Sequence, residues 1–224
     1  MIWILFYYNS LPDFPKECKL IPSHIMFRDF FECNLTNTNH YQYPKFETSS
    51  YDEGCHPGEV RRFVRKTDAD KYTVFYTRHT GINGGSKNKV VGYFKVGKID
   101  RFDGKVGFYS SETVLLPKKD CIEINYRSRG VPVSWGDSSV KEEIDNILRY
   151  LIKIKDTAHL NIAMEYKQAT KEIMAKLVSP GGRKQLFSTC RDCLHGKECF
   201  LGNKFRREGL DFLHNLYRKQ ECSS

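Results

Sequence analysis

Three cysteines in the last part of the chain have the spacing of metal ligands. Cys190 and Cys193 are separated by two residues, and Cys199 follows after five more. Two thiols on one tight turn with a third close behind can converge on one ion. Thiolates suit zinc or an iron–sulfur cluster, whereas magnesium and calcium require oxygen ligands. The spacing therefore predicts a metal or cluster site, with three reduced structural cysteines as the alternative.

A closed tetrahedral site needs a fourth ligand. His195 is only two residues from Cys193, which is cramped, and Cys222 lies close to the chain end. A distant cysteine is therefore a serious candidate, and we include Cys55 in the expected ligand set. The alternatives that stay open are Cys121, His195, His214 and Cys222.

The cysteine spacing resembles that of known iron–sulfur proteins. A CxxC pair, five residues and a third cysteine, with one more cysteine far upstream, is similar to the C-terminal iron–sulfur staple of CRISPR-associated and AddB-like nucleases. The resemblance implies a 4Fe–4S cluster as the alternative to zinc, and a nucleic-acid-processing enzyme as the alternative function. The paired acids of those nucleases have no counterpart here, since the candidate acids are scattered: Asp100, Asp103, Glu112 and Asp120.

The overall charge points to a polyanionic partner. Lysine and arginine outnumber acids by 36 to 27, which gives a net charge of +9. DNA or RNA recognition needs cations for phosphate and aromatic faces for bases. The alternative for each candidate is a solvated charge or a core aromatic. The residues that we expect to contact nucleic acid are Arg61, Arg62, Tyr76, Arg78, His79, Arg127, Arg129 and Trp135.

Alternating and helical hydrophobic patterns predict the elements that position these residues. We expect strands at 2–8, 71–77 and 90–99, with a glycine-rich connection that makes the last two an antiparallel hairpin. Shorter strands are expected at 107–109 and 122–126. A helix capped by Ser138 or Ser139 should follow, and then a second helix over 157–177.

The predicted hairpin resembles a known superfamily. Val74-Phe75-Tyr76 and the strand that begins Val90-Val91-Gly92-Tyr93-Phe94 are similar to the central hairpin of PUA-like domains, which include the EVE, ASCH and YTH readers. The resemblance implies a small β-barrel that binds a base or nucleotide in a cleft, with partners in DNA or RNA modification.

These observations predict an α+β protein in three parts: a PUA-like β-barrel domain at 1–137, a helical segment packed on it at 138–182, and a cysteine-rich metal-binding tail at 183–224. Asn9 and Pro12 interrupt the apolar start long before a membrane span of roughly 20 residues. Without a recognisable signal peptide, the clustered cysteines favour a reducing, cytoplasmic location without membrane association. The expected function is a nucleic-acid or nucleotide binding module with a structural metal site, and a modified base in DNA or RNA is the candidate ligand.

Overall fold

The structure is a computed structural model of the 224-residue chain. It describes residues 1–8, 50–53, 58–80, 86–102, 105–126, 132–179, 181, 184–185, 188–189 and 192. The chain divides into two compact units, one with residues 1–10 and 41–166 and the other with residues 11–40 and 167–224. Every strand that the structure describes belongs to the first unit. The three-part organisation expected from the sequence stays a prediction.

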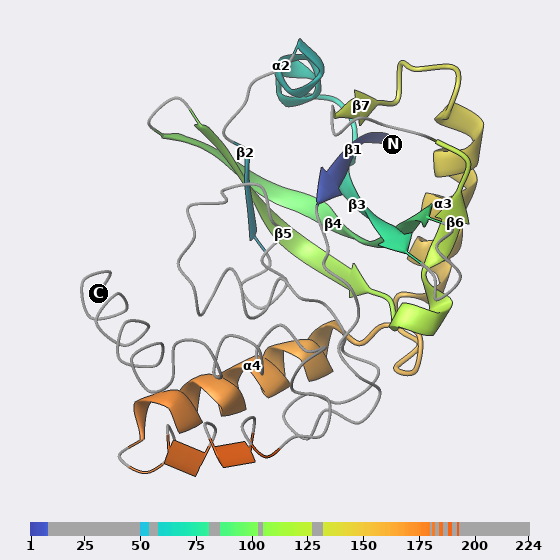
Figure 1. Cartoon of the computed structure of the whole chain (residues 1–224). Helices are drawn as coiled ribbons and strands as arrows, with labels where there is room; N and C mark the ends of the chain where they lie inside the picture. The colour runs from blue at the N-terminus through green and yellow to red at the C-terminus, as the bar shows by residue number, and fades with distance from the viewer. Residues whose placement is uncertain are drawn as a thin grey trace. The chain divides into compact units, whose positions relative to one another are not determined.

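The first unit is built on a mixed sheet (Figure 1). Six of its strands lie in the order β2-β5-β4-β3-β1-β7, and β6 pairs with β4 beside that path. Together with the helices, they confirm the predicted α+β class. The strands are β1 (Ile2–Tyr8), β2 (Ser50–Glu53), β3 (Lys71–Thr80), β4 (Ser86–Phe102), β5 (Lys105–Leu115), β6 (Ile122–Ile124) and β7 (Val133–Ser134).

The centre of the sheet is formed by the strands with the strongest sequence pattern. β1 pairs with β3 in parallel, from Ile2 opposite Lys71 to Tyr8 opposite Thr77. β3 and β4 are antiparallel, which confirms the predicted hairpin. Both faces of β3 are buried from residue 72 to residue 77, as is usual for a central strand with covered faces.

The predicted closed barrel is wrong, because the described strands form an open path that ends at β2 and β7. The sheet is nevertheless strongly bent. β4 changes register against β5 around Val96, and such bulges bend strands. As a result, Phe108 of β5 comes within 6.0 Å (ring centroids) of Phe6 on β1, although two strands separate β5 from β1 in the sheet.

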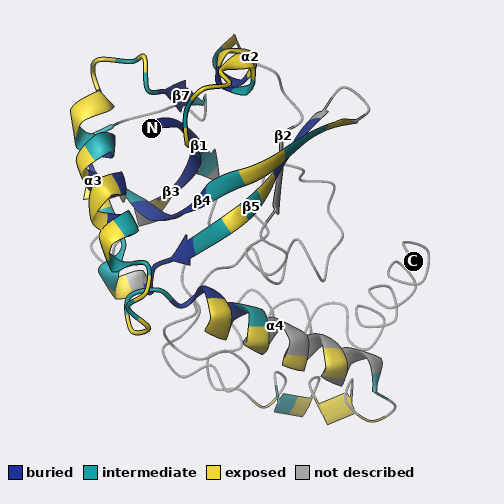
Figure 2. Ribbon diagram, turned by 180° about the vertical axis from the view of Figure 1, so that it is seen from behind, coloured by how far each residue is buried: buried dark blue, intermediate teal, exposed yellow. Residues whose placement is uncertain are grey.

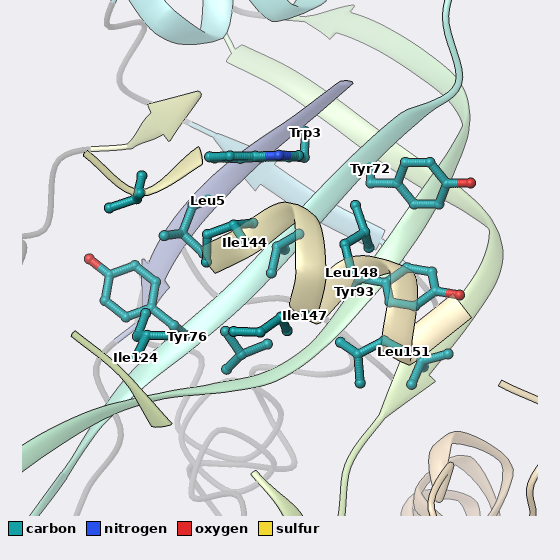
Figure 3. Close-up of a cluster of buried hydrophobic side chains, with 14 of the residues drawn as sticks. Trp3, Leu5, Tyr72, Tyr76, Tyr93, Ile124, Ile144, Ile147, Leu148 and Leu151 are labelled. Atoms are coloured by element: carbon teal, nitrogen blue, oxygen red, sulfur yellow. The ribbon is translucent and has the colours of Figure 1, made fainter. Parts of the chain in front are cut away.

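Helix α3 (Lys141–Ile154) covers one face of the sheet. Figure 3 shows Ile144, Leu148 and Leu151 of this helix among side chains of the sheet that include Leu5 and Tyr93. These residues recur at helical spacing, so the burial of one α3 face confirms the predicted amphipathic helix. Figure 2 shows the opposite side of α3 exposed.

The predicted cap of this helix is wrong. Val140 occupies the N-cap position and makes no side-chain capping bond. Ser139 instead donates both its backbone N–H and its hydroxyl to Asp137, at 2.9 and 2.6 Å. Those bonds close the turn before the helix, and they lower the pKa of the Asp137 carboxyl.

Helix α4 (Ala163–Val178) begins six residues later than the sequence predicted. The residues before it form turns, and the Asn161 side chain explains why. Asn161 donates to the carbonyl of Lys155 at 2.7 Å and accepts from the backbone N–H of Leu115 at 3.2 Å, which ties the segment to β5. No helix in the described part of the chain is long and apolar enough to cross a membrane.

Candidate nucleic-acid interface

Helix α2 (Gly58–Arg65) presents an exposed face made of arginines. Val60 and Phe63 are fully buried and define its inner side. With 3.6 residues per turn, Arg61, Arg62 and Arg65 fall within an arc of about 100° on the opposite side. The exposed outer surface of α2 is visible in Figure 2. Burial of two apolar side chains therefore orients three cations toward solvent.

Aromatic contacts fix α2 against the sheet. The ring centroid of Phe63 lies 5.8 Å from that of Phe108 on β5 and 6.2 Å from that of Trp135, which directly follows β7. Lys71 at the start of β3 donates to the carbonyl of Val64 at 3.0 Å, near the C-terminus of the helix, where a cation is favourable. α2 thereby contacts β5, the start of β3 and the residue after β7.

A carboxylate and a glycine position Arg62. Glu59 forms an ion pair with Arg62 at 3.2 Å and accepts a hydrogen bond from the hydroxyl of buried Ser134. A Cβ atom on Gly136 would lie 3.0 Å from the Arg62 guanidinium, so the absence of a side chain at Gly136 leaves the space that this guanidinium occupies. Arg62 still has 58% of its side chain exposed. Among the described residues, Arg61 and Arg65 have no carboxylate at ion-pair distance.

Trp135 packs against α2 through Phe63, and Gly136, the next residue, lies against Arg62. Trp135 is partly exposed and packs against the buried cluster between the sheet and α3. Its backbone N–H donates to the carbonyl of Trp3 at 3.1 Å. Trp3, in contrast, is fully buried and donates its indole N–H to Asp145 at 2.8 Å.

Two further predicted contact residues lie toward the other end of β3. Arg78 is seven residues from Lys71, about 23 Å along an extended strand. Tyr76 is fully buried, with its ring 5.3 Å from that of Tyr7 and 6.2 Å from that of Tyr126. In this structure Tyr76 is a core residue, and a buried ring offers no face to a base.

The backbone of His79 extends β3 beyond Arg78. Arg127 and Arg129 lie outside the described residues. The structure thus places Arg61 and Arg62 on the exposed side of α2, with Arg62 against Gly136, the residue after Trp135. Tyr76 and Arg78 lie toward the other end of β3. Arg65, which belongs to the same basic run in the sequence, lies on the same side of α2 because it is one helical turn after Arg61.

The predicted metal ligands Cys190, Cys193, Cys199 and Cys55 lie outside the described residues, as do His195, His214 and Cys222. Cys121 is partly buried, and its thiol donates to the carbonyl oxygen of Pro117 at 3.5 Å. Within the described part of the chain, no three His, Cys, Asp or Glu side chains are grouped as a metal site would require. The zinc or iron–sulfur site therefore stays a prediction.

One polar cluster was not anticipated from the sequence. The hydroxyl of buried Tyr93 donates to Glu112 at 2.6 Å, and Lys155, just after α3, donates to the other carboxylate oxygen at 2.6 Å. Burial and the bond to Glu112 raise the pKa of Tyr93. Burial alone would raise the pKa of Glu112, but the hydrogen bonds from Lys155 and Tyr93 outweigh it and lower that pKa.

This cluster extends along β3 and β4. The ring of Tyr72 lies 5.6 Å from that of Tyr93, edge to face, and the Lys95 ammonium lies 5.9 Å from the Tyr72 ring centre. Lys95 also pairs with Asp70 at 3.2 Å. Each charge in the cluster has an opposite partner: Lys95 pairs with Asp70, and Lys155 pairs with Glu112. The second pair joins the end of α3 to β5. The sequence signal was weak because these residues are far apart along the chain.

Comparisons with known protein families, with curated proteins and with solved structures find no match for this chain.

Proposed function

We propose that the protein binds nucleic acid, and that the arginine face of α2 contacts the phosphates. The observation that carries this proposal is the composition of the exposed side of α2. Opposite Val60 and Phe63, the helix carries Arg61, Arg62 and Arg65 and no acid. Glu59, the acid of the first turn, lies toward Ser134.

Arginine suits this role because its planar guanidinium donates several hydrogen bonds to phosphate oxygens and stays charged. The helix supports these side chains rigidly, since Phe63 packs against two aromatic rings, Phe108 and Trp135. A rigid helix beneath the arginines reduces the conformational entropy that is lost when the protein binds its ligand. The net charge of +9 adds long-range attraction for a polyanion.

The test compares two double variants that remove the same charge. Arg61→Ala with Arg65→Ala removes two cations from α2, and Arg149→Ala with Lys153→Ala removes two exposed cations from α3. Fluorescence anisotropy with a labelled oligonucleotide at low salt measures the affinity. We expect the α2 variant to bind roughly tenfold to a hundredfold more weakly and the α3 variant to change little. Equal losses in the two variants would mean that only net charge matters.

A further inference from the structure

We propose that the strand held by α2 is single-stranded, and that one of its bases stacks on Trp135. This inference rests on the proposed function, because it assigns the type of nucleic acid to the same site. It is drawn from two observations: Trp135 is partly exposed, and Gly136, the next residue, lies against the Arg62 guanidinium of α2.

The Trp135 ring is preorganised. The ring centroids of Phe63 and Trp135 are 6.2 Å apart, with an interplanar angle of 53°. The backbone N–H of Trp135 donates a hydrogen bond to the carbonyl of Trp3. A ring that is held in place and stays partly exposed can serve as a stacking platform, since little side-chain freedom is lost when a base packs on it.

One cation of α2 lies close to the turn that carries the indole. Arg62 lies against Gly136, the residue that comes after Trp135. Arg61 and Arg65 are four residues apart, or about 6 Å along the helix axis, which is comparable to the separation of successive phosphates in a strand. The site therefore offers phosphate contacts and one stacking face within a footprint of a few nucleotides.

This combination favours a single strand over a duplex. In a duplex each base is stacked between its neighbours, and presenting one to a protein ring costs unstacking energy. In a single strand the base faces are accessible, and stacking on an aromatic side chain contributes about 1–3 kcal/mol per base. DNA and RNA share this chemistry, so oligonucleotides of both kinds belong in the test.

Tryptophan fluorescence gives a direct readout. The chain has two tryptophans, and Trp3 is fully buried, so solvent-sensitive changes report Trp135. Unlabelled single-stranded DNA or RNA is titrated into the wild-type protein, and a duplex of the same sequence is titrated in parallel. We expect quenching by one or both single strands and little quenching by the duplex. Equal quenching and equal affinity for strand and duplex would overturn the inference.

Two variants separate stacking from phosphate binding. Trp135→Phe keeps an aromatic face against Phe63 and should retain most single-strand affinity, with the quenching signal lost. Trp135→Leu should weaken single-strand binding about tenfold while duplex binding and the salt dependence stay unchanged. Circular dichroism confirms that both variants are folded.

The outcomes distinguish the two proposals. If no nucleic acid binds in a salt-dependent way, the proposed function itself fails. If binding depends on Arg61 and Arg65 but is unaffected by Trp135→Leu and shows no quenching, then α2 contacts phosphate and the stacking inference alone is wrong.

Discussion

Glu112 shows how one carboxylate can join separate elements. It accepts hydrogen bonds from Tyr93 on β4 and from Lys155 after α3. The Tyr93 hydroxyl is buried, so loss of its acceptor would leave an unsatisfied polar group, which is costly. Because Glu112 lies at a partly exposed position, we expect a moderate contribution to stability from its charge.

The lowered pKa of Glu112 makes this contribution depend on pH. The stabilisation is fully present above the ordinary pKa of 4.5 and is lost as the pH falls through the lower pKa of the folded state. Glu112→Gln keeps an acceptor for Tyr93 but removes the charge. We expect it to lower the free energy of unfolding by about 1 kcal/mol at neutral pH. Urea denaturation should show this gap shrinking well below pH 4.5, and a constant gap would contradict the role of the Glu112 charge.

At the scale of residues, local sequence patterns did not predict which contacts a given side chain makes. A serine with Glu142 three positions later matched a capping box, yet Asp137 takes the hydrogen bonds of Ser139. Tyr76 matched a stacking residue but lies in the core, because β3 is covered on both faces. The burial of Tyr76 depends on the position of β3 within the sheet, which the local sequence pattern does not give.

At the scale of elements, the sequence predicted β1, β3 and β4 because each contains a long run rich in apolar and aromatic residues. Only part of β5 was expected, since Ser110, Ser111 and Glu112 interrupt its apolar pattern. Those polar residues lie opposite the irregular stretch of β4 around Val96. The open sheet was not predicted either, since closure depends on pairing between strands that are distant in sequence.

Gly92 tests the pairing of β4 with β5. A Cβ atom there would lie 2.0 Å from the carbonyl oxygen of Val114, which is backbone and cannot move aside locally. We expect Gly92→Ala to lower the free energy of unfolding by about 3 kcal/mol or more. Gly58→Ala is the control, because nothing lies within 4 Å of its Cβ, and it should change stability by less than about 0.5 kcal/mol. Comparable thermal unfolding of the two variants would be evidence against the strand register.

At the scale of the whole molecule, the cysteine pattern makes its own prediction. Protein purified without oxygen should contain stoichiometric zinc, or iron and sulfide with visible absorption if a cluster is present. Cys193→Ser should reduce the metal content because it removes one of three closely spaced thiolates. Metal analysis that finds no bound ion in either protein would contradict the prediction.

The basic run at Arg61, Arg62, Arg65 and Lys66 was apparent in the sequence, but its orientation was not. A run of charges becomes a surface only when the fold decides which residues are buried. Here the burial of Val60 and Phe63 fixes the orientation of α2. The rings that contact Phe63 come from β5 and from the turn after β7. The contact of Arg62 with Gly136, next to Trp135, could therefore not be predicted from the sequence.

The most direct test of phosphate contact by α2 is the salt dependence of binding. The slope of log affinity against log salt concentration counts neutralised phosphates, at about 0.9 per contact for duplex DNA and 0.7 for single strands. For Arg61→Ala with Arg65→Ala, we predict a slope that is smaller than that of the wild type by about 1.4 to 1.8. Parallel slopes for the two proteins would show that these arginines do not contact phosphate, and would contradict the proposed function of this face.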